Sequence, residues 1–485
     1  MKSLRSRLFG TIHPVEAAFL GLLYGWGVYL WGMFLNWGRI PLDWHDWAES
    51  NAPRLAFLQD ALRRLTFPLH MPGSYVLRGV TDRFFTLPDQ IISPQIVLLA
   101  GLDVPTFILI NTLLLYTLGF LGLLALRQRY GLAPLAFAGL FFIFNFNGHI
   151  LTHTTVGHIT WGGHFFFPWL ALLALRLAEG EGGWKWITQT ALLLWAMMLQ
   201  GSFHHFVWAC LFLGLLALPL WKRLPAVTAA LAFGVMLSLF QLLPPSLNWG
   251  KFDQDFLGGY PMLRYLPDAM LNERLPDMSA LFQAYNSRLG WWEYDLYIGY
   301  AGAAFLLGGL ALWAGFALKR RTWGHLSVLL PLAALTFFAT GERYRLIANL
   351  NLPLFSSDRV SARMVILPLV MGAVLAALGW QQGWQAFTSQ LQGRWAWVRY
   401  GAAAGMLPGV GLLGWDVSRH AVNWSVLKAY PHFPHTPLDL TLSVVANRPD
   451  PPYIELLALG GGLSLLALAV LLWLYRRFAA KRPAR

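Results

Sequence analysis

The chain carries little charge for its length. Only 12% of its 485 residues are Asp, Glu, Lys or Arg, whereas soluble proteins carry about 25%. That deficit excludes a polar surface large enough to dissolve a protein of this size. Hydrophobic residues make up 56% of the chain, and their runs are long rather than alternating. Lipid is therefore the expected solvent, and helices rather than a barrel are the expected way of satisfying the backbone in it.

Cysteine and the motifs of soluble cofactor domains are almost missing as well. The single cysteine, Cys210, lies in an apolar run, cannot form an intrachain disulfide and is expected to be a small buried hydrophobe. The sequence has no P-loop, no GxSxG elbow and no Rossmann glycine fingerprint. Nothing therefore points to ATP use or to a soluble cofactor domain.

Apolar segments predict an all-α, polytopic transmembrane bundle of about twelve spans, in which residues 1–485 form a single integral membrane domain. The first segment has no small-residue cleavage site, so we expect a retained helix and not a removed signal. The predicted spans are 16–35, 105–126, 132–146, 162–178, 187–200, 206–221, 224–243, 298–317, 326–340, 362–379, 399–416 and 454–474.

The distribution of charge predicts the topology. With the N-terminus in the cytoplasm, the inner segments hold 19 of the 36 basic residues and two acids, while the much longer outer segments hold 17 basic residues and 20 of the 23 acids. This bias follows the positive-inside rule and places both termini in the cytoplasm. The net charge of +13 is then explained by topology and anionic lipid, so no nucleic acid partner is expected.

Three long outer segments are predicted, at about 36–104, 244–297 and 417–453. In the first, residues 51–65 place Leu55, Leu58, Leu62 and Leu65 at helical spacing, which predicts an amphipathic helix in the membrane interface. The run SPQIVLLAGL from Ser93 is apolar but too short to span, and predicts a re-entrant or interfacial piece.

The first group of residues suited to chemistry is LDWHDW, just past the first span. Asp43 and Asp46 are three residues apart, with His45 between them. Two carboxylates on one turn of chain can share a site, where one acts as a general base and the other positions a substrate or metal. The alternative is an outer loop with solvated acids and aromatic anchors.

Histidines form the second group, in NFNGHILTHTTVGHITWGGH. His149 and His153 are four residues apart and can share a helix face, and His158 follows. With an Asp from the first loop, these histidines could supply the three or four ligands of a zinc site. Neutral histidines also bind sugars, phosphates and carbonyls. The sequence leaves a divalent metal, a polar substrate pocket and a structural role open.

Two further groups lie near the outer ends of other spans. His204 and His205 occupy a short turn between the fifth and sixth spans, at a depth where they should face a cavity rather than lipid. Glu293 and Asp295, in WWEYDLYIGY, combine acids with aromatic rings, a pairing found where sugar rings bind. We expect both groups to line a substrate pocket, with ordinary interfacial turns as the alternative.

Arg359 and Arg363 lie four residues apart at the outer start of the tenth span, in SSDRVSARM. If that segment is helical, both guanidinium groups share a face and form an anion site suited to phosphate. The alternative is interfacial snorkelling with a local salt bridge. Because no nucleotide motif is present, a bound phosphate is expected to arrive on a lipid.

These residues together resemble the GT-C superfamily of membrane glycosyltransferases. The resemblance covers residues 10 to 380 loosely: acids in the first outer loop, an amphipathic helix after them, FNFNGHI followed by VGHITW and FFPWL, and SSDRVSARMVILPLV, which is similar to a segment of large YfhO-like members in a bacterial and archaeal branch. It implies an inverting transferase that takes sugar from a polyprenyl-phosphate carrier. Asp46, or else Asp43, would be the base, and Arg359 and Arg363 would bind the donor phosphate.

The resemblance also implies a location and partners. The protein would lie in a prokaryotic plasma membrane, act in cell-envelope glycosylation on the extracytoplasmic face, and bind a polyprenyl-phosphate-linked sugar, membrane lipid and an unidentified acceptor. Two rival readings stay open. One is a transporter or flippase for a lipid-linked or anionic substrate, which predicts ionisable groups near the bilayer midplane. The other is a non-catalytic subunit of a membrane complex whose histidines hold a metal or haem.

Overall fold

The fold is taken from a computed structural model, which describes residues 13–69, 90–248, 256–277, 284–287, 289–349, 358–391, 396–436 and 451–479. Parts of the three predicted outer segments, at 70–89, 249–255, 278–283 and 437–450, lie outside the described residues. Within those described, the chain folds into helices joined by turns, and the only β-type pairings are three isolated bridges. The all-α fold class is therefore confirmed.

A helix coincides with each of the twelve predicted spans. Their bounds are α2 Pro14–Phe34, α4 Val104–Tyr130, α5 Pro134–Phe146, α7 Phe167–Ala178, α8 Trp184–Leu199, α9 Phe203–Ala217, α10 Leu224–Leu237, α14 Gly299–Lys319, α16 Leu329–Phe338, α18 Ile366–Gln390, α19 Ala396–Asn423 and α21 Pro451–Leu474. Six stretches, those containing α2, α4, α5, α14, α18 and α21, are long and apolar enough to cross a membrane. A seventh is possible if α10 and α11 (Leu239–Leu242), bent by 59°, form one span.

The remaining helices are short or less apolar than a span requires by this measure. One of the six candidate spans is itself interrupted: α5 ends at Phe146, and α6 (Gly148–Thr155) begins after Asn147, whose side chain accepts a hydrogen bond from the Ile150 amide. The membrane character of the fold is thus carried by six helices, and the full set of twelve spans stays a prediction.

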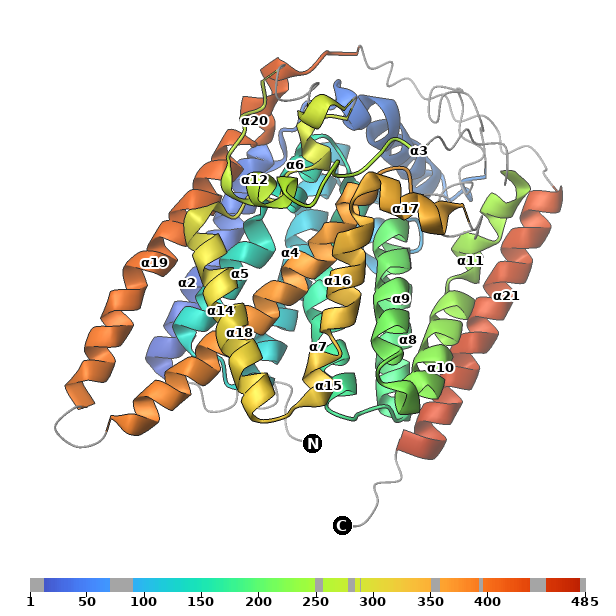
Figure 1. The fold of residues 1–485 in the computed structure, drawn as a ribbon. Coiled ribbons are helices and arrows are strands. Elements are labelled where there is room, and N and C mark those ends of the chain that lie inside the picture. The colour runs from blue at the N-terminus through green and yellow to red at the C-terminus, as the bar shows by residue number, and fades with distance from the viewer. Residues whose placement is uncertain are drawn as a thin grey trace.

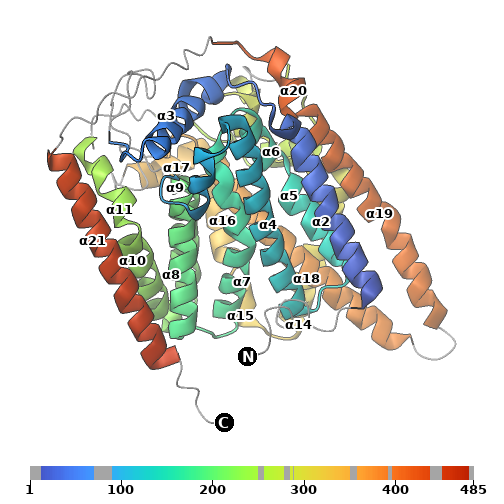
Figure 2. The same ribbon diagram turned by 180° about the vertical axis from the view of Figure 1, so that it is seen from behind.

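The long helices lie side by side, and most of the short ones gather at one end of the bundle (Figures 1 and 2). That end, called here the α3 end, carries α3 (Ala52–Arg63), α6, α12 (Tyr265–Leu271), α17 (Gly341–Ala348) and α20 (Val426–Ala429). Helix α2 begins and α21 ends at the opposite end of the bundle. At that opposite end Arg129 pairs with Glu179 and Glu181, which ties the ends of α4 and α7 together.

The amphipathic stretch of the first loop does form a helix, α3, but its apolar face has a different use from the one expected. Leu55 and Leu58 are buried inside the protein, at 2% and 1% exposed, whereas Leu65 lies past the helix end and is 94% exposed. The apolar SPQIVLLAGL run forms the 3₁₀ helix η4 (Pro94–Ala100), whose Leu99 carbonyl accepts a hydrogen bond from Gln59 of α3. Protein, rather than lipid alone, covers the apolar face of α3.

The packing of α14 against α18 is the most extensive helix contact in the bundle. It depends on glycine, because Gly309 and Gly379 face each other at the crossing and leave no room for a side chain. Small residues let membrane helices approach until their backbones touch. Trp380 then donates a hydrogen bond of 2.8 Å to the Phe305 carbonyl across the same interface.

We expect Gly379→Ala to destabilise the bundle, because the added Cβ would overlap the Gly309 carbonyl oxygen. The cost of such overpacking is about 1–3 kcal/mol, measured as a lower thermal unfolding midpoint in detergent. Gly315→Ala on α14 is the matched control, since an added Cβ there meets nothing within 4 Å. Equal midpoints for the two variants would contradict the close crossing.

Candidate functional site

Hydrogen bonds join the DWHDW turn of the first loop to the end of α6 and the turn that follows it. His45 has a left-handed backbone, with φ of 44°, a conformation that is unusual for a residue with a side chain and is often found at functional sites. Asp46 directly precedes a short π-helix, η2 (Trp47–Asn51). Side chains of this segment bond to three successive backbone carbonyls: His45 to Val156 at 3.2 Å, Trp47 to Thr155 at 2.9 Å, and Asn51 to Gly157.

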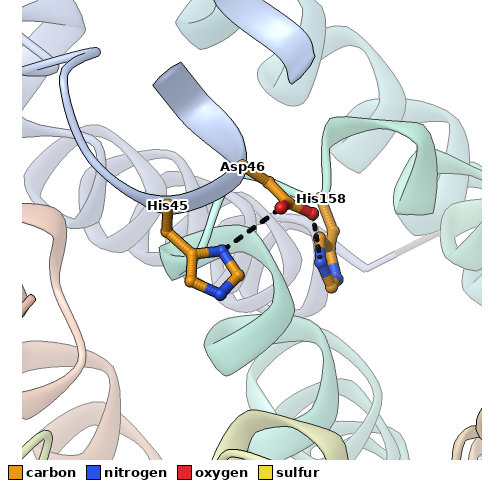
Figure 3. A group of neighbouring side chains, drawn as sticks. All are labelled: His45, Asp46 and His158. Atoms are coloured by element: carbon orange, nitrogen blue, oxygen red, sulfur yellow. Dashed lines mark ion pairs between the residues drawn. The ribbon is translucent and has the colours of Figure 1, made fainter. Parts of the chain in front are cut away.

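These hydrogen bonds place Asp46 in contact with His158, which lies 112 residues further along the chain. His158 Nε2 lies 2.8 Å from Asp46 Oδ2, and His45 Nδ1 lies 3.5 Å from Asp46 Oδ1 (Figure 3). The Asp46 side chain is 34% exposed, whereas His158 is 10% exposed. The carboxylate is therefore partly accessible, whereas the imidazole is largely buried.

A second imidazole continues the chain of contacts inward. His153 and His158 approach each other through their Nδ1 atoms at 2.7 Å. If His158 donates from Nε2 to the carboxylate, its Nδ1 must accept from His153, because a neutral imidazole carries one hydrogen. The result is an Asp46–His158–His153 series of hydrogen bonds that can hold Asp46 in place and share a proton delivered to it.

Asp46 is electrostatically prepared to stay ionised. Burial by itself would raise its pKa, but the interaction with His158, with smaller contributions from His45 and Arg363, holds the pKa of Asp46 well below its usual range. The carboxylate is therefore available as a proton acceptor or metal ligand throughout the physiological pH range.

Arg363 binds Glu293 in a two-point ion pair. Its Nε and Nη2 donate to the two Glu293 carboxylate oxygens, each at 2.5 Å. Burial raises the pKa of Glu293, but the Arg363 charge and these hydrogen bonds outweigh it, so the pKa is lowered. Arg363 Nη1 is the guanidinium nitrogen that the carboxylate does not use, and among the described residues it donates no hydrogen bond, which leaves it for an anionic ligand.

Two indole rings connect this ion pair to Asp46. Trp161 stacks on His153 at 4.3 Å between ring centroids, and the Arg363 guanidinium lies 5.3 Å from the Trp161 centroid. Trp292 donates to Glu293 at 3.1 Å and lies 4.7 Å from the His45 ring. These contacts join four segments into one cluster, called here the Asp46 cluster. Its members are His45, Asp46, His153, His158, Trp161, Trp292, Glu293 and Arg363.

Asp43 lies beside a different set of groups. Its Oδ2 accepts a hydrogen bond of 2.9 Å from the Tyr430 hydroxyl and lies 4.0 Å from His435 Nδ1. The pKa of Tyr430 is raised by that hydrogen bond. The two acids of the first loop thus have separate partners, and Asp46 alone is joined to the histidines and to Arg363.

The other predicted pocket histidines lie around Trp161. His149 and His153 share α6 as expected, with ring centroids 4.4 Å apart, and His204 and His205 contact the Trp161 ring at 5.9 and 4.8 Å. The Nε2 atoms of His149, His153 and His205 are buried, and within the described part of the chain they have no hydrogen-bond partner. They surround the cluster without touching Asp46.

Asp358, which was not predicted as a site residue, contacts Trp208 and His204 beside the Trp161 ring. It accepts a hydrogen bond of 2.7 Å from Trp208, and its other oxygen lies 3.9 Å from His204 Nδ1. Burial raises the pKa of Asp358 to about 6. Its neighbour Arg359 has a buried Nε with no hydrogen-bond partner among the described residues.

The expectation that Arg359 and Arg363 share a helix face is wrong. The 3₁₀ helix η10 (Ser361–Val365) begins only after Val360, which is extended and pairs with Gly258. Arg359 uses its backbone carbonyl to accept hydrogen bonds from Leu257 and Gly258. It therefore belongs to this extended pairing, and Arg363 alone is joined to the Asp46 cluster by described contacts.

Asp295 belongs to a second buried group rather than to the Asp46 cluster. His420 of α19 lies between two carboxylates, 3.2 Å from Asp295 and 3.5 Å from Glu273. Asp295 also accepts a hydrogen bond of 2.9 Å from Trp291. No local pattern could have indicated His420 or Glu273, because they lie more than 100 residues from each other and His420 lies more than 100 residues from Asp295. This group joins α19 to the segment before α14.

The Asp46 cluster contains a partial set of metal ligands. One ligand atom from each of His45, Asp46 and His158 lies within 4.8 Å of the others, close enough to meet an ion at about 2 Å from each atom after a small closure. Such an ion would take the place of the Asp46–His158 hydrogen bond and would supply a Lewis acid beside the Arg363 guanidinium.

Comparisons of the chain with protein-family models, curated proteins and solved structures find no match. The resemblance to membrane glycosyltransferases therefore stays a prediction. The function is argued below from the geometry of the Asp46 cluster.

Chelator-stripped protein is expected to bind Co²⁺ at His45, Asp46 and His158, and to show the visible absorption of an ion with nitrogen and oxygen ligands. His158→Gln should remove the bands, because the imidazole nitrogen that faces Asp46 is lost. His204→Gln is the control, since that ring lies outside the set and the bands should persist. A wild-type protein without Co²⁺ bands would restrict Asp46 and His158 to proton transfer.

Proposed function

We propose that this protein is an inverting membrane glycosyltransferase that moves a sugar from a polyprenyl-phosphate carrier to an acceptor hydroxyl. The observation that carries the proposal is the joining of a partly exposed, ionised first-loop carboxylate and a largely buried guanidinium in the Asp46 cluster. A transfer of this kind needs a base at the acceptor and a cation at the departing phosphate.

The reaction assigns a role to each charged group. The acceptor oxygen attacks the anomeric carbon while Asp46 takes its proton, and the bond from that carbon to the phosphate oxygen breaks. The electron pair leaves with the phosphate, where Arg363 Nη1 stabilises the developing negative charge. Glu293 holds the guanidinium in a fixed orientation through two hydrogen bonds, and His158 holds the carboxylate.

The location of the cluster suits a lipid-borne donor. We place the α3 end on the extracytoplasmic face of a prokaryotic plasma membrane and both termini in the cytoplasm, following the excess of basic residues in the short connecting segments of the other end. All twelve helices would then cross the bilayer, with the shorter ones shielded by their neighbours. A phosphate at the interface beside Arg363 would leave the polyprenyl chain in lipid.

Asp46→Asn should abolish sugar transfer, with a loss of about 10²–10⁴-fold, because removing a general base costs that much. Water can replace the unidentified acceptor, so the assay is release of labelled sugar from polyprenyl-phosphate-linked mannose and glucose by purified protein in liposomes. Asp43→Asn, matched in chemistry and only three residues away, should keep activity within a few-fold because Asp43 contacts Tyr430 instead.

Equal activity in wild-type protein and the Asp46→Asn variant would remove the proposed base. Donor binding without any release of sugar, in the presence of added glycan, lipid and peptide acceptors, would contradict the transferase and favour a transporter or flippase of the same donor.

A further inference from the structure

A groove separate from the Asp46 cluster runs along α19 near the α3 end. It has a volume of about 580 Å³ and lies between α2, α5 and α19, a size typical of binding sites for small ligands, which span roughly 300–1,000 Å³. Helices α2 and α19 lie side by side in both views of the bundle (Figures 1 and 2). The groove is thus walled by three helices and is more than a patch of outer surface.

The lining of the groove changes from apolar to polar toward the α3 end. Its apolar part is formed by Trp26, Tyr29 and Leu30 of α2, Phe142 of α5 and Trp415 of α19. Beyond residue 417 the lining is mostly polar, with Ser418, Arg419, Asn423 and Lys428 beside the single apolar Val422. A membrane lipid has the same order of parts, since its chains lie in the hydrocarbon and its headgroup lies at the interface.

The polar part presents positive charge. Lys428 is exposed, its contact is a 3.5 Å hydrogen bond to Asn423, and no carboxylate of the described residues lies within ion-pair distance. Arg419 is shared with two acids, Glu273 at 2.8 Å and Asp416 at 4.0 Å, but its closest contacts all use Nη2. Its Nε and Nη1 are left for a ligand.

A buried hydroxyl provides an independent indication of a ligand. Ser418 is only 8% exposed, yet its Oγ is buried without a hydrogen-bond partner among the described residues. Buried polar atoms are rarely left unpaired in this way, because each costs about 1–3 kcal/mol. Ser418 lies where the apolar lining gives way to the cations, at the level where the phosphate or glycerol of a lipid would lie.

We infer that this groove binds an anionic phospholipid of the bilayer, with its phosphate between Lys428 and Arg419, its glycerol region at Ser418, and its chains along Trp26, Tyr29 and Trp415. The site is distinct from the proposed catalytic cluster. It does not depend on the transferase reaction, because its occupant is a structural or regulatory lipid and not the sugar donor.

Native mass spectrometry of the purified protein with added phosphatidylglycerol or phosphatidylcholine of identical chains tests the inference. Phosphatidylglycerol should bind more tightly, and Lys428→Gln should weaken it by about five-fold, the factor that corresponds to the ~1 kcal/mol gained per basic residue near anionic lipid. Arg264→Gln is the matched control, because Arg264 is an exposed guanidinium outside the groove, and it should bind as the wild type does.

A second pair of variants tests whether filling the groove with a large side chain prevents lipid binding. Gly411 lines the groove and an added Cβ there meets nothing within 4 Å, so Gly411→Phe should fold normally, fill the groove and abolish the phosphatidylglycerol adduct. Gly401→Phe, at an equally open position of α19 outside the groove, should retain it.

Three results would overturn the inference. One is equal binding of the two phospholipids, and another is binding unaffected by Lys428→Gln and Gly411→Phe. The third is selective binding of polyprenyl phosphate in place of phosphatidylglycerol with the same sensitivity to the variants. The last result would make the groove a donor site, and it is independent of whether Asp46 supports sugar release.

Discussion

A buried guanidinium at the end of a membrane bundle is stable only when a carboxylate meets it, because an isolated charge in such surroundings costs several kcal/mol. Arg363 and Glu293 satisfy that constraint through two parallel hydrogen bonds. The pair joins the start of α18 to the segment before α14, and both reach the first loop through Trp161 and Trp292. The arrangement of the α3 end depends on this contact.

The Arg363–Glu293 pair also accounts for the distribution of charge in the Asp46 cluster. Glu293 neutralises Arg363, so the guanidinium can be held beside the histidine rings without leaving an unpaired buried charge. Asp46 is left as the more accessible charged group, 34% exposed, with His158 at 2.8 Å from it. An anionic ligand would meet the one guanidinium nitrogen that Glu293 does not use, and an acceptor hydroxyl would meet Asp46. Binding and proton transfer are thus assigned to neighbouring but separate groups.

The sequence predicted those parts of the fold that depend on local pattern. Each predicted apolar span coincides with a helix. His149 and His153, four residues apart, lie on the same helix, α6, and the amphipathic stretch forms α3. It could not predict that α3 buries Leu55 and Leu58 in protein, since an apolar helix face looks the same whether lipid or protein covers it. The apolar pattern also could not predict helix lengths, because breaks such as the one at Asn147 depend on capping by a single side chain.

The candidate site was predicted by residue type but not by partnership. Asp43 and Asp46 are equivalent in sequence, and only the hydrogen bonds to Tyr430 and His158 separate them. Arg359 and Arg363 have helical spacing, yet the extended pairing of Val360 with Gly258 delays the helix until Ser361. Trp161 and Asp358 lie within the quoted motifs, yet neither was predicted as a site residue. In each case the deciding contact joins residues about 100 or more positions apart, which periodicity cannot register.

The most direct measurement is an electron cryo-microscopy structure of the protein in lipid nanodiscs with polyprenyl monophosphate. The account predicts phosphate density within hydrogen-bond distance of the Arg363 guanidinium, on the side that the Asp46 carboxylate faces, with the Arg363–Glu293 pair intact. Phosphate bound elsewhere, or Asp46 and Arg363 facing different cavities, would contradict it.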